Sequence, residues 1–140
     1  MYKNKAIDLE TDPFRKAKLL LSIASQYRNK SISTAYSYAR KALKERPSYG
    51  DAYLLIAGLY SKSANSCGKS EFEKRMVYVA AANMASKAKS VDPGSATKAS
   101  RSIRSYLKNA PSKKLIFNEG KKSGDSHKIG CWIGTTVRIP

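Results

Sequence analysis

The feature that most constrains the fold is a set of apolar and small residues that recurs along the chain at fixed offsets. Steps of three and four residues place side chains on one face of a helix. One such face recurs after 33 residues, and a second face, made of alanines and closed by a proline, recurs after 46. The first pair of faces is Leu20, Ile23, Ala24 and Tyr27 with Tyr53, Ile56, Ala57 and Tyr60; the second is Ala35, Ala39, Ala42 and Pro47 with Ala81, Ala85, Ala88 and Pro93.

Cap residues and prolines set the limits of the predicted helices. Asp and Ser are favoured immediately before a helix, whereas proline lacks a backbone donor and clashes with the preceding turn. A fifth helix repeats the first kind of face, because Tyr106 follows Tyr60 by 46 residues. The predicted helices begin at Asp12 and Pro13, at Ser31 or Ser33, at Asp51, at Glu71 and at Ser95; Pro47, Asp92-Pro93-Gly94 and Asn109-Ala110-Pro111 end the second, fourth and fifth.

The sizes of the recurring side chains indicate how these helices pack. Two helices approach closely only where one of them presents a small side chain at the contact. Tyr27, Tyr60 and Tyr106 each lie near the end of a predicted first helix. We expect each of them to fill the gap to the next helix pair. The pattern therefore predicts a mainly α fold built from helix pairs.

At these residues the chain resembles the tetratricopeptide repeat (TPR) family. The resemblance covers roughly residues 13–111 and implies a right-handed α-α solenoid of two full repeats plus a capping helix. Leu20 and Tyr53 stand where the family has Trp, and Ala24 and Ala57 where it usually has Gly. The second repeat exceeds the family's length of about 34 residues by about 12. The surplus falls at about residues 61–72, as either a long loop or two extended helices.

The ends of the chain lie outside the two repeats. Residues 1–12 are interpreted as the end of a preceding repeat helix or as an N-terminal cap, and the first interpretation would make the chain part of a longer array. Neither a signal peptide nor a membrane span is predicted within the chain, although a longer parent protein could be exported. The compartment is left open.

The tail at residues 112–140 changes from a helical to a strand-like pattern. Residues 127–133 and 135–139 are β-prone and join near Gly134, which predicts a small β-hairpin. Its Gly-x-Trp-Ile sequence, with the Thr-Thr-Val-Arg that follows, is similar to the tail of a group of bacterial TPR proteins. We expect Trp132 to fix this hairpin to the helices.

Charge indicates an acidic partner. The 140 residues hold 27 Lys and Arg against 10 Asp and Glu, a net charge of +17. Such an excess favours nucleic acid, an anionic membrane or an acidic protein surface. One His and two Cys exclude a multi-His metal site and a disulfide-dense scaffold. The cysteines fit two free thiols or one bridge, and free thiols are favoured.

The sequence offers weak candidates for catalysis. Gly68-Lys69-Ser70 suggests a phosphate-binding loop, but Ser63 stands where that motif needs a Gly, so a loop or helix cap is favoured. His127, Cys131 and Cys67 lack a fourth zinc ligand. We therefore expect no enzyme activity, no cofactor and no metal.

The resemblance instead implies a binding groove lined by the first helix of each pair. Its walls would be cationic and its middle apolar, which suits an acidic peptide with apolar anchors. The expected groove residues are Lys18, Leu21, Ser25, Arg28, Leu54, Leu55, Lys62, Arg101, Arg104 and Lys108, with Gly58 and Ser61 between them. Function is thus predicted to be protein binding by a scaffold. The alternative, a basic helical-repeat protein that binds nucleic acid, needs exposed stacking residues, whereas most tyrosines occupy packing positions.

Overall fold

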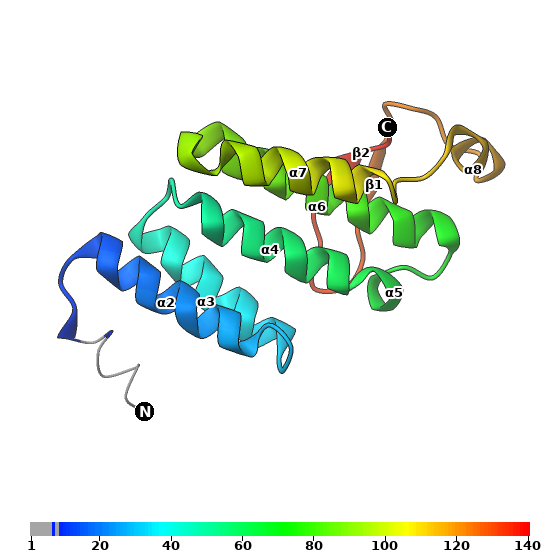
Figure 1. Cartoon of the computed structure of the whole chain (residues 1–140). Coiled ribbons are helices and arrows are strands. Elements are labelled where there is room, and N and C mark those ends of the chain that lie inside the picture. Colours follow the sequence, from blue (N-terminus) through cyan, green and yellow to red (C-terminus); the bar gives the residue numbers. More distant parts are fainter. Residues whose placement is uncertain (1–6, 8) are drawn as a thin grey trace.

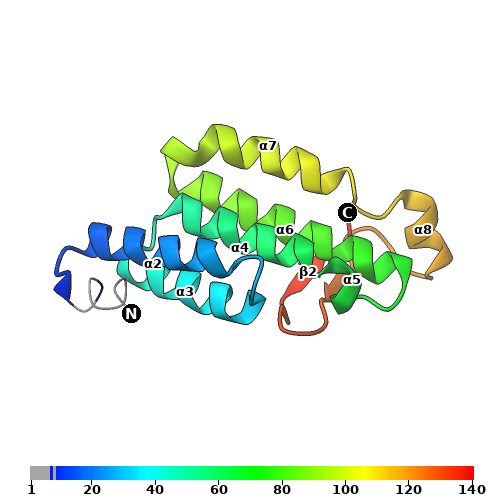
Figure 2. The same ribbon diagram turned by 60° about the horizontal axis from the view of Figure 1, so that its bottom comes forward.

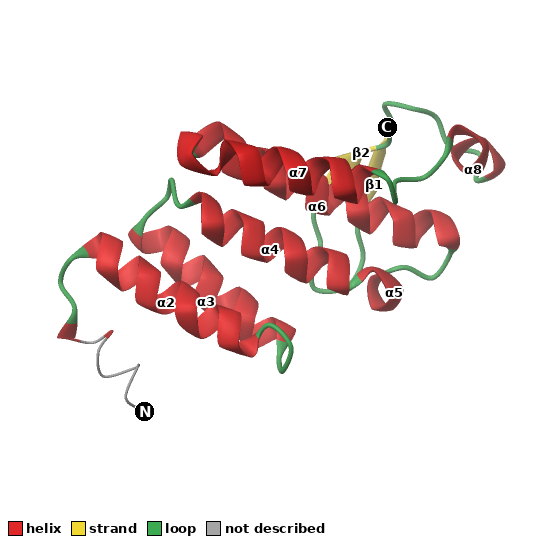
Figure 3. Ribbon diagram, in the orientation of Figure 1, coloured by secondary structure: helices red, strands yellow, loops and turns green. Residues whose placement is uncertain are grey.

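The computed structural model describes residue 7 and residues 9–140, and in these the chain is mainly helical with a small antiparallel sheet (Figures 1 and 3). The mainly α prediction is confirmed. The elements, in chain order, are α2 (Pro13–Tyr27), α3 (Ile32–Glu45), α4 (Gly50–Lys62), α5 (Ala64–Cys67), α6 (Glu71–Val91), a 3-10 turn η1 (Pro93–Ser95), α7 (Ala96–Leu107), α8 (Lys113–Asn118), β1 (Ser126–Lys128) and β2 (Thr136–Arg138).

The most extensive helix contacts are between α2 and α3, between α4 and α6, and between α6 and α7, while α3 also packs on α4. In Figure 1 α4 lies between α2 and α7, and α3 lies behind α2. Figure 2 shows α6 between α4 and α7. β1 lies against α6, where the His127 ring contacts Phe72. Helix α8 lies beyond the start of α6 (Figures 1 and 2).

The alanine faces lie in the core, as the sequence predicts. Ala35, Ala39 and Ala42 of α3 are fully buried, and so are Ala81, Ala85 and Ala88 of α6. The methyl side chain of alanine occupies little volume, so these faces allow two helices to pack closely against each other. Larger side chains, among them Ile56 and Phe72, fill the space around them.

Most predicted helix starts are confirmed. The side chains of Asp12, Ser31 and Ser70 each accept a hydrogen bond from a backbone N–H in the first turn of the helix that follows. Ser70 and Glu73 form a reciprocal capping box at the start of α6. Gly68-Lys69-Ser70 is therefore a loop that leads into a helix cap.

The start of α4 differs from the prediction. The helix begins at Gly50, one residue before the predicted Asp51, and its first free N–H is bound by a distant side chain. The Gly50 N–H donates to Asp92 Oδ2 at 3.0 Å, and Asp92 also accepts from the Gly94 N–H and the Ser95 hydroxyl. These hydrogen bonds hold the pKa of Asp92 below its ordinary value. One carboxylate thus joins the start of α4 to the turn after α6.

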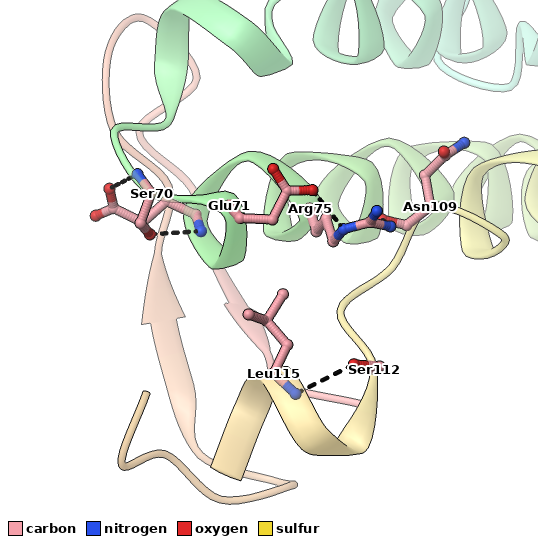
Figure 4. Close-up of polar contacts among 7 residues, drawn as sticks. Ser70, Glu71, Arg75, Asn109, Ser112 and Leu115 are labelled. Carbon is pink, nitrogen blue, oxygen red and sulfur yellow. Dashed lines mark hydrogen bonds and ion pairs between the residues drawn. The ribbon is translucent and has the colours of Figure 1, made fainter. Parts of the chain in front are cut away.

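The insert at residues 61–72 combines both arrangements considered from the sequence. α4 runs on to Lys62, the short helix α5 follows, and α6 extends over 21 residues from Glu71. The start of α6 is also tied to the segment before α8 (Figure 4). There the Arg75 side chain contacts the Glu71 carboxylate at 2.8 Å and the Asn109 carbonyl at 3.3 Å.

The tail departs from the prediction in two ways. Ile116 lies in the unpredicted helix α8, whose N-cap Ser112 accepts from the Leu115 N–H (Figure 4). The strands are shorter than predicted and pair antiparallel, with His127 opposite Val137. Residues 129–135 form a loop instead of strand, because Cys131 has a positive φ of 54° and is covalently held. Buried Ile129, Ile133, Val137 and Ile139 join the tail to the main core.

The prediction of free thiols is wrong, because Cys67 and Cys131 form a disulfide. The bond joins the end of α5 to the tail loop across 64 residues of sequence. Nothing local to either cysteine indicates that these segments meet. The disulfide also removes the thiols that a Cys-His pair or a zinc site would need.

Trp132 lies against the helices, as expected. Its ring contacts Tyr36 and Tyr60, with centroids 4.9 and 5.3 Å away, and its Nε1 donates to the buried Ser63 hydroxyl at 3.0 Å. Cys131 and Trp132 are consecutive residues, so the disulfide and the Trp132 contacts fix the tail loop at neighbouring positions.

The tyrosines do not occupy equivalent positions, contrary to the expectation. The Tyr60 ring contacts Trp132 of the tail, whereas the Tyr106 hydroxyl lies beside Gly58 of α4. Tyr27 instead stacks on Tyr38 of the helix that follows it. The interpretation of residues 1–12 falls largely outside the described residues, although Ile7 is buried in the core.

Candidate partner-binding surfaces

The expected groove residues lie on α2, α4 and α7, which follow one another in this order across the face seen in Figure 1. α2 carries Lys18, Leu21 and Ser25, with Arg28 as its C-cap; α4 carries Leu54, Leu55 and Lys62; α7 carries Arg101 and Arg104, with Lys108 as its C-cap. We call these residues the α2–α4–α7 face.

The cations of this face are exposed. Within the described residues, none of these exposed cations forms an ion pair; they are Lys18, Arg28, Arg101, Arg104 and Lys108. Lys62 differs, because its ammonium donates to the Asn29 side-chain oxygen in the α2–α3 turn. A carboxylate of a partner could therefore bind these cations without breaking an existing ion pair.

The apolar residues of the face are only partly available. Leu21 and Leu55 are half-buried and pack against the core, while Leu54 is half-buried without belonging to that packing. Their remaining exposed area could contact an apolar side chain of a partner.

Tyr106 covers part of the face between α4 and α7. A Cβ on Gly58 would lie 4.0 Å from its hydroxyl oxygen, and Ser61 shares a hydrogen bond with that hydroxyl. Burial raises the pKa of Tyr106, and the bond to Ser61 opposes this shift. Gly58 and Ser61, expected to line the groove, therefore contact a side chain of the protein itself.

Replacing Gly58 of α4 by alanine is predicted to stabilise the fold. Glycine inside a helix costs about 0.5–1 kcal/mol relative to alanine, and the new methyl would make ordinary contact with Tyr106. Gly58→Ala is expected to raise the free energy of unfolding by about 0.5–1 kcal/mol, measured by urea denaturation. A decrease would mean that the methyl displaces Tyr106 and that the α4–α7 contact is tighter than described.

The structure also forms a basic hollow that the sequence reasoning missed. It has a volume of about 660 Å³ and is lined by residues of α3 together with Tyr53 of α4. The lining residues are Tyr36, Ser37, Arg40, Lys41, Leu43, Lys44 and Tyr53, and we call them the α3 hollow. A signal was present, since Tyr36, Arg40 and Lys44 follow one another at steps of four residues, a spacing that brings side chains together on a helix.

His127, a candidate from the sequence, packs against α6. Its ring packs edge-on against Phe72 at 5.3 Å, and burial lowers its pKa although the Glu73 carboxylate opposes the shift. The neighbouring sulfurs of Cys67 and Cys131 are bonded to each other. Across the described residues, His, Cys, Asp and Glu form no group of three or more placed to share a metal ion.

In comparisons with family models, curated proteins and solved structures, nothing matches this chain. Among the described residues, no helix is both long enough and apolar enough to cross a bilayer. The functional argument therefore depends on the two surfaces themselves.

Proposed function

We propose that the chain is a TPR-like right-handed α-α solenoid, with two repeats and a capping helix, that acts as a non-enzymatic scaffold for protein binding. Support for the fold comes from the recurring alanine faces of α3 and α6, which are fully buried, and from the sequential packing of α2 through α7. The non-equivalent positions of the tyrosines count against a strict repeat but not against stacked helix pairs.

The partner is an acidic peptide that docks on the α2–α4–α7 face. The observation that carries this proposal is the set of exposed, unpaired cations on three neighbouring helices. Guanidinium and ammonium groups form strong charge-assisted hydrogen bonds with carboxylates. The exposed parts of Leu21, Leu54 and Leu55 receive apolar side chains of the peptide. Rim charges of this kind set the association rate, whereas the desolvated contacts set affinity.

The test uses a defined probe, a dodecapeptide of repeating Glu-Glu-Leu, titrated at about 0.15 M salt. The charge-reversal variant R101E/R104E is expected to weaken binding at least about tenfold, while K87E/K89E, with the same charge change on exposed positions of α6, changes it less than about twofold. Circular dichroism would check that both variants remain folded.

Several outcomes contradict the proposal. Equal losses in the two variants would mean diffuse attraction by net charge. Equal binding of a Gln-Gln-Leu peptide would remove the role of the carboxylates. Sub-micromolar binding of single-stranded DNA at the same salt, with a steep salt slope, would replace protein binding by nucleic-acid binding as the function.

A further inference from the structure

The α3 hollow combines a row of cations with half-exposed aromatic rings, and it shares no residue with the α2–α4–α7 face. We propose that it binds a linear acidic polysaccharide, one whose sugar rings carry carboxylate or sulfate groups. The inference does not depend on the proposed function, because the two surfaces lie on different helix faces and take different ligands.

The cations of the hollow are available to a ligand. Arg40, Lys41 and Lys44 are exposed, and none of them forms an ion pair within the described residues. The acidic residue of α3, Glu45, is paired instead with Lys16 of α2 at 3.4 Å. Lys41 and Lys44 also line a second hollow of about 440 Å³ on the other flank of α3. Positive charge therefore continues across the helix, as an extended polyanion requires.

The aromatic rings distinguish this surface from a plain basic patch. Tyr36 and Tyr53 are half-exposed and line the hollow, and the Arg40 guanidinium lies 6.0 Å from the centre of the Tyr36 ring. The faces of aromatic rings carry partial negative charge, so they attract the C–H groups on the flat side of a sugar ring. The cations beside them would bind the acidic substituents of that sugar.

The spacing suits one charge per sugar ring. Arg40 and Lys44 are one helical turn apart, which places them about 6 Å apart along the axis of α3. That distance is close to the repeat of a pyranose chain, in which each ring carries one acidic group. A hollow of about 660 Å³ has room for a few such rings.

The disulfide favours a polysaccharide over nucleic acid. Single-stranded nucleic acid also stacks on aromatic rings beside cations, so the hollow alone would accept either polymer. Disulfides such as Cys67–Cys131 form and persist in oxidising compartments outside the cytosol. Acidic polysaccharides are abundant at cell surfaces, whereas single-stranded nucleic acid is mainly intracellular. The occupant we infer is therefore the glycan.

Trp132 supplies a direct reporter for the experiment. It is the one tryptophan of the chain, and its ring lies 4.9 Å from Tyr36. The disulfide-bonded chain is titrated at about 0.15 M salt with an octagalacturonate, a sulfated heparin octasaccharide, neutral maltooctaose and an eight-nucleotide oligo(dT), with tryptophan fluorescence and calorimetry as readouts. Binding of at least one acidic glycan with a fluorescence change is expected, maltooctaose should not bind, and oligo(dT) should bind at least about fivefold more weakly.

Variants assign the binding to the hollow. R40Q/K44Q is expected to weaken glycan binding at least about tenfold, and Tyr53→Leu, which keeps an apolar side chain but removes the ring, about fivefold. The control K87Q/K89Q loses the same two charges from exposed positions of α6 and should change binding less than about twofold. Thermal melts confirm that each variant is folded.

The proposal fails on any of four results. The first is that neither acidic glycan binds, and the second is that oligo(dT) binds as tightly as the glycan. The third is that R40Q/K44Q and its control lose equal amounts of glycan affinity. The fourth is that Tyr53→Leu binds the glycan with wild-type affinity. The second result would assign the hollow to nucleic acid, and the fourth would reduce it to a charge patch.

Discussion

Replacing both cysteines, in the variant C67S/C131S, is expected to lower the free energy of unfolding by about 4 kcal/mol. The disulfide closes a loop across 64 residues, and a loop of this length restricts the unfolded chain strongly. A loss of this size is a large share of the roughly 5–15 kcal/mol that stabilises a typical domain. Urea denaturation of the variant beside the oxidised wild type measures it.

The same experiment has an internal control. Reduced wild-type protein keeps both sulfur atoms but lacks the covalent bond. Because the bond is what stabilises the fold, this protein should unfold at the same urea concentration as C67S/C131S. Hydrogen exchange should show the largest loss of protection in the tail and α5, since these are the segments that the bond joins. A change below about 1 kcal/mol would mean that Trp132 and the buried isoleucines hold the tail without the bond.

Gly68→Ala is expected to destabilise the fold by about 1–3 kcal/mol. Gly68 has an ordinary extended backbone, with φ −120° and ψ 140°, so the effect is steric and not conformational. An added Cβ would lie 2.4 Å from the backbone nitrogen of Lys74 and 2.8 Å from its Cα. Backbone atoms in the first turn of α6 cannot rotate away as a side chain would, so either the helix start or the disulfide-bonded α5 must move.

The comparison with Gly58→Ala makes this prediction specific. Both variants add one methyl group to a glycine beside a helix contact, but their predicted effects on unfolding free energy have opposite signs. Urea denaturation of both proteins under one set of conditions tests them together. A Gly68→Ala protein within about 0.5 kcal/mol of wild type would show that the α5–α6 junction adapts easily.

The sequence predicts the helices of this protein well because their signals are local. Caps such as Asp12 and Ser70 act within one turn, and alanine faces repeat at the helical period. The exception at α4 has a non-local cause, since its first N–H is bound by Asp92, 42 residues away. Helix α8 was missed because its short apolar run is too brief to show a period.

The binding surfaces were predicted less well, for a different reason. The sequence identifies which residues lie on α2, α4 and α7, but it cannot indicate that Tyr106 covers Gly58. It also cannot indicate that the tail loop meets α5, and so the disulfide was not expected. The α3 hollow depends on Tyr53 reaching the edge of a neighbouring helix. Each of these features arises from contacts between segments far apart in the chain.

The buried isoleucines of the tail have a consequence for biosynthesis. Ile129, Ile133 and Ile139 belong to the same core as α2 through α6, yet the ribosome adds them after all of those helices. Until they emerge, the nascent helices expose apolar surface, and Cys67 lacks Cys131, its disulfide partner. Folding of this protein is therefore completed after synthesis of the tail, and a chaperone would find its binding surface on the helices before that point.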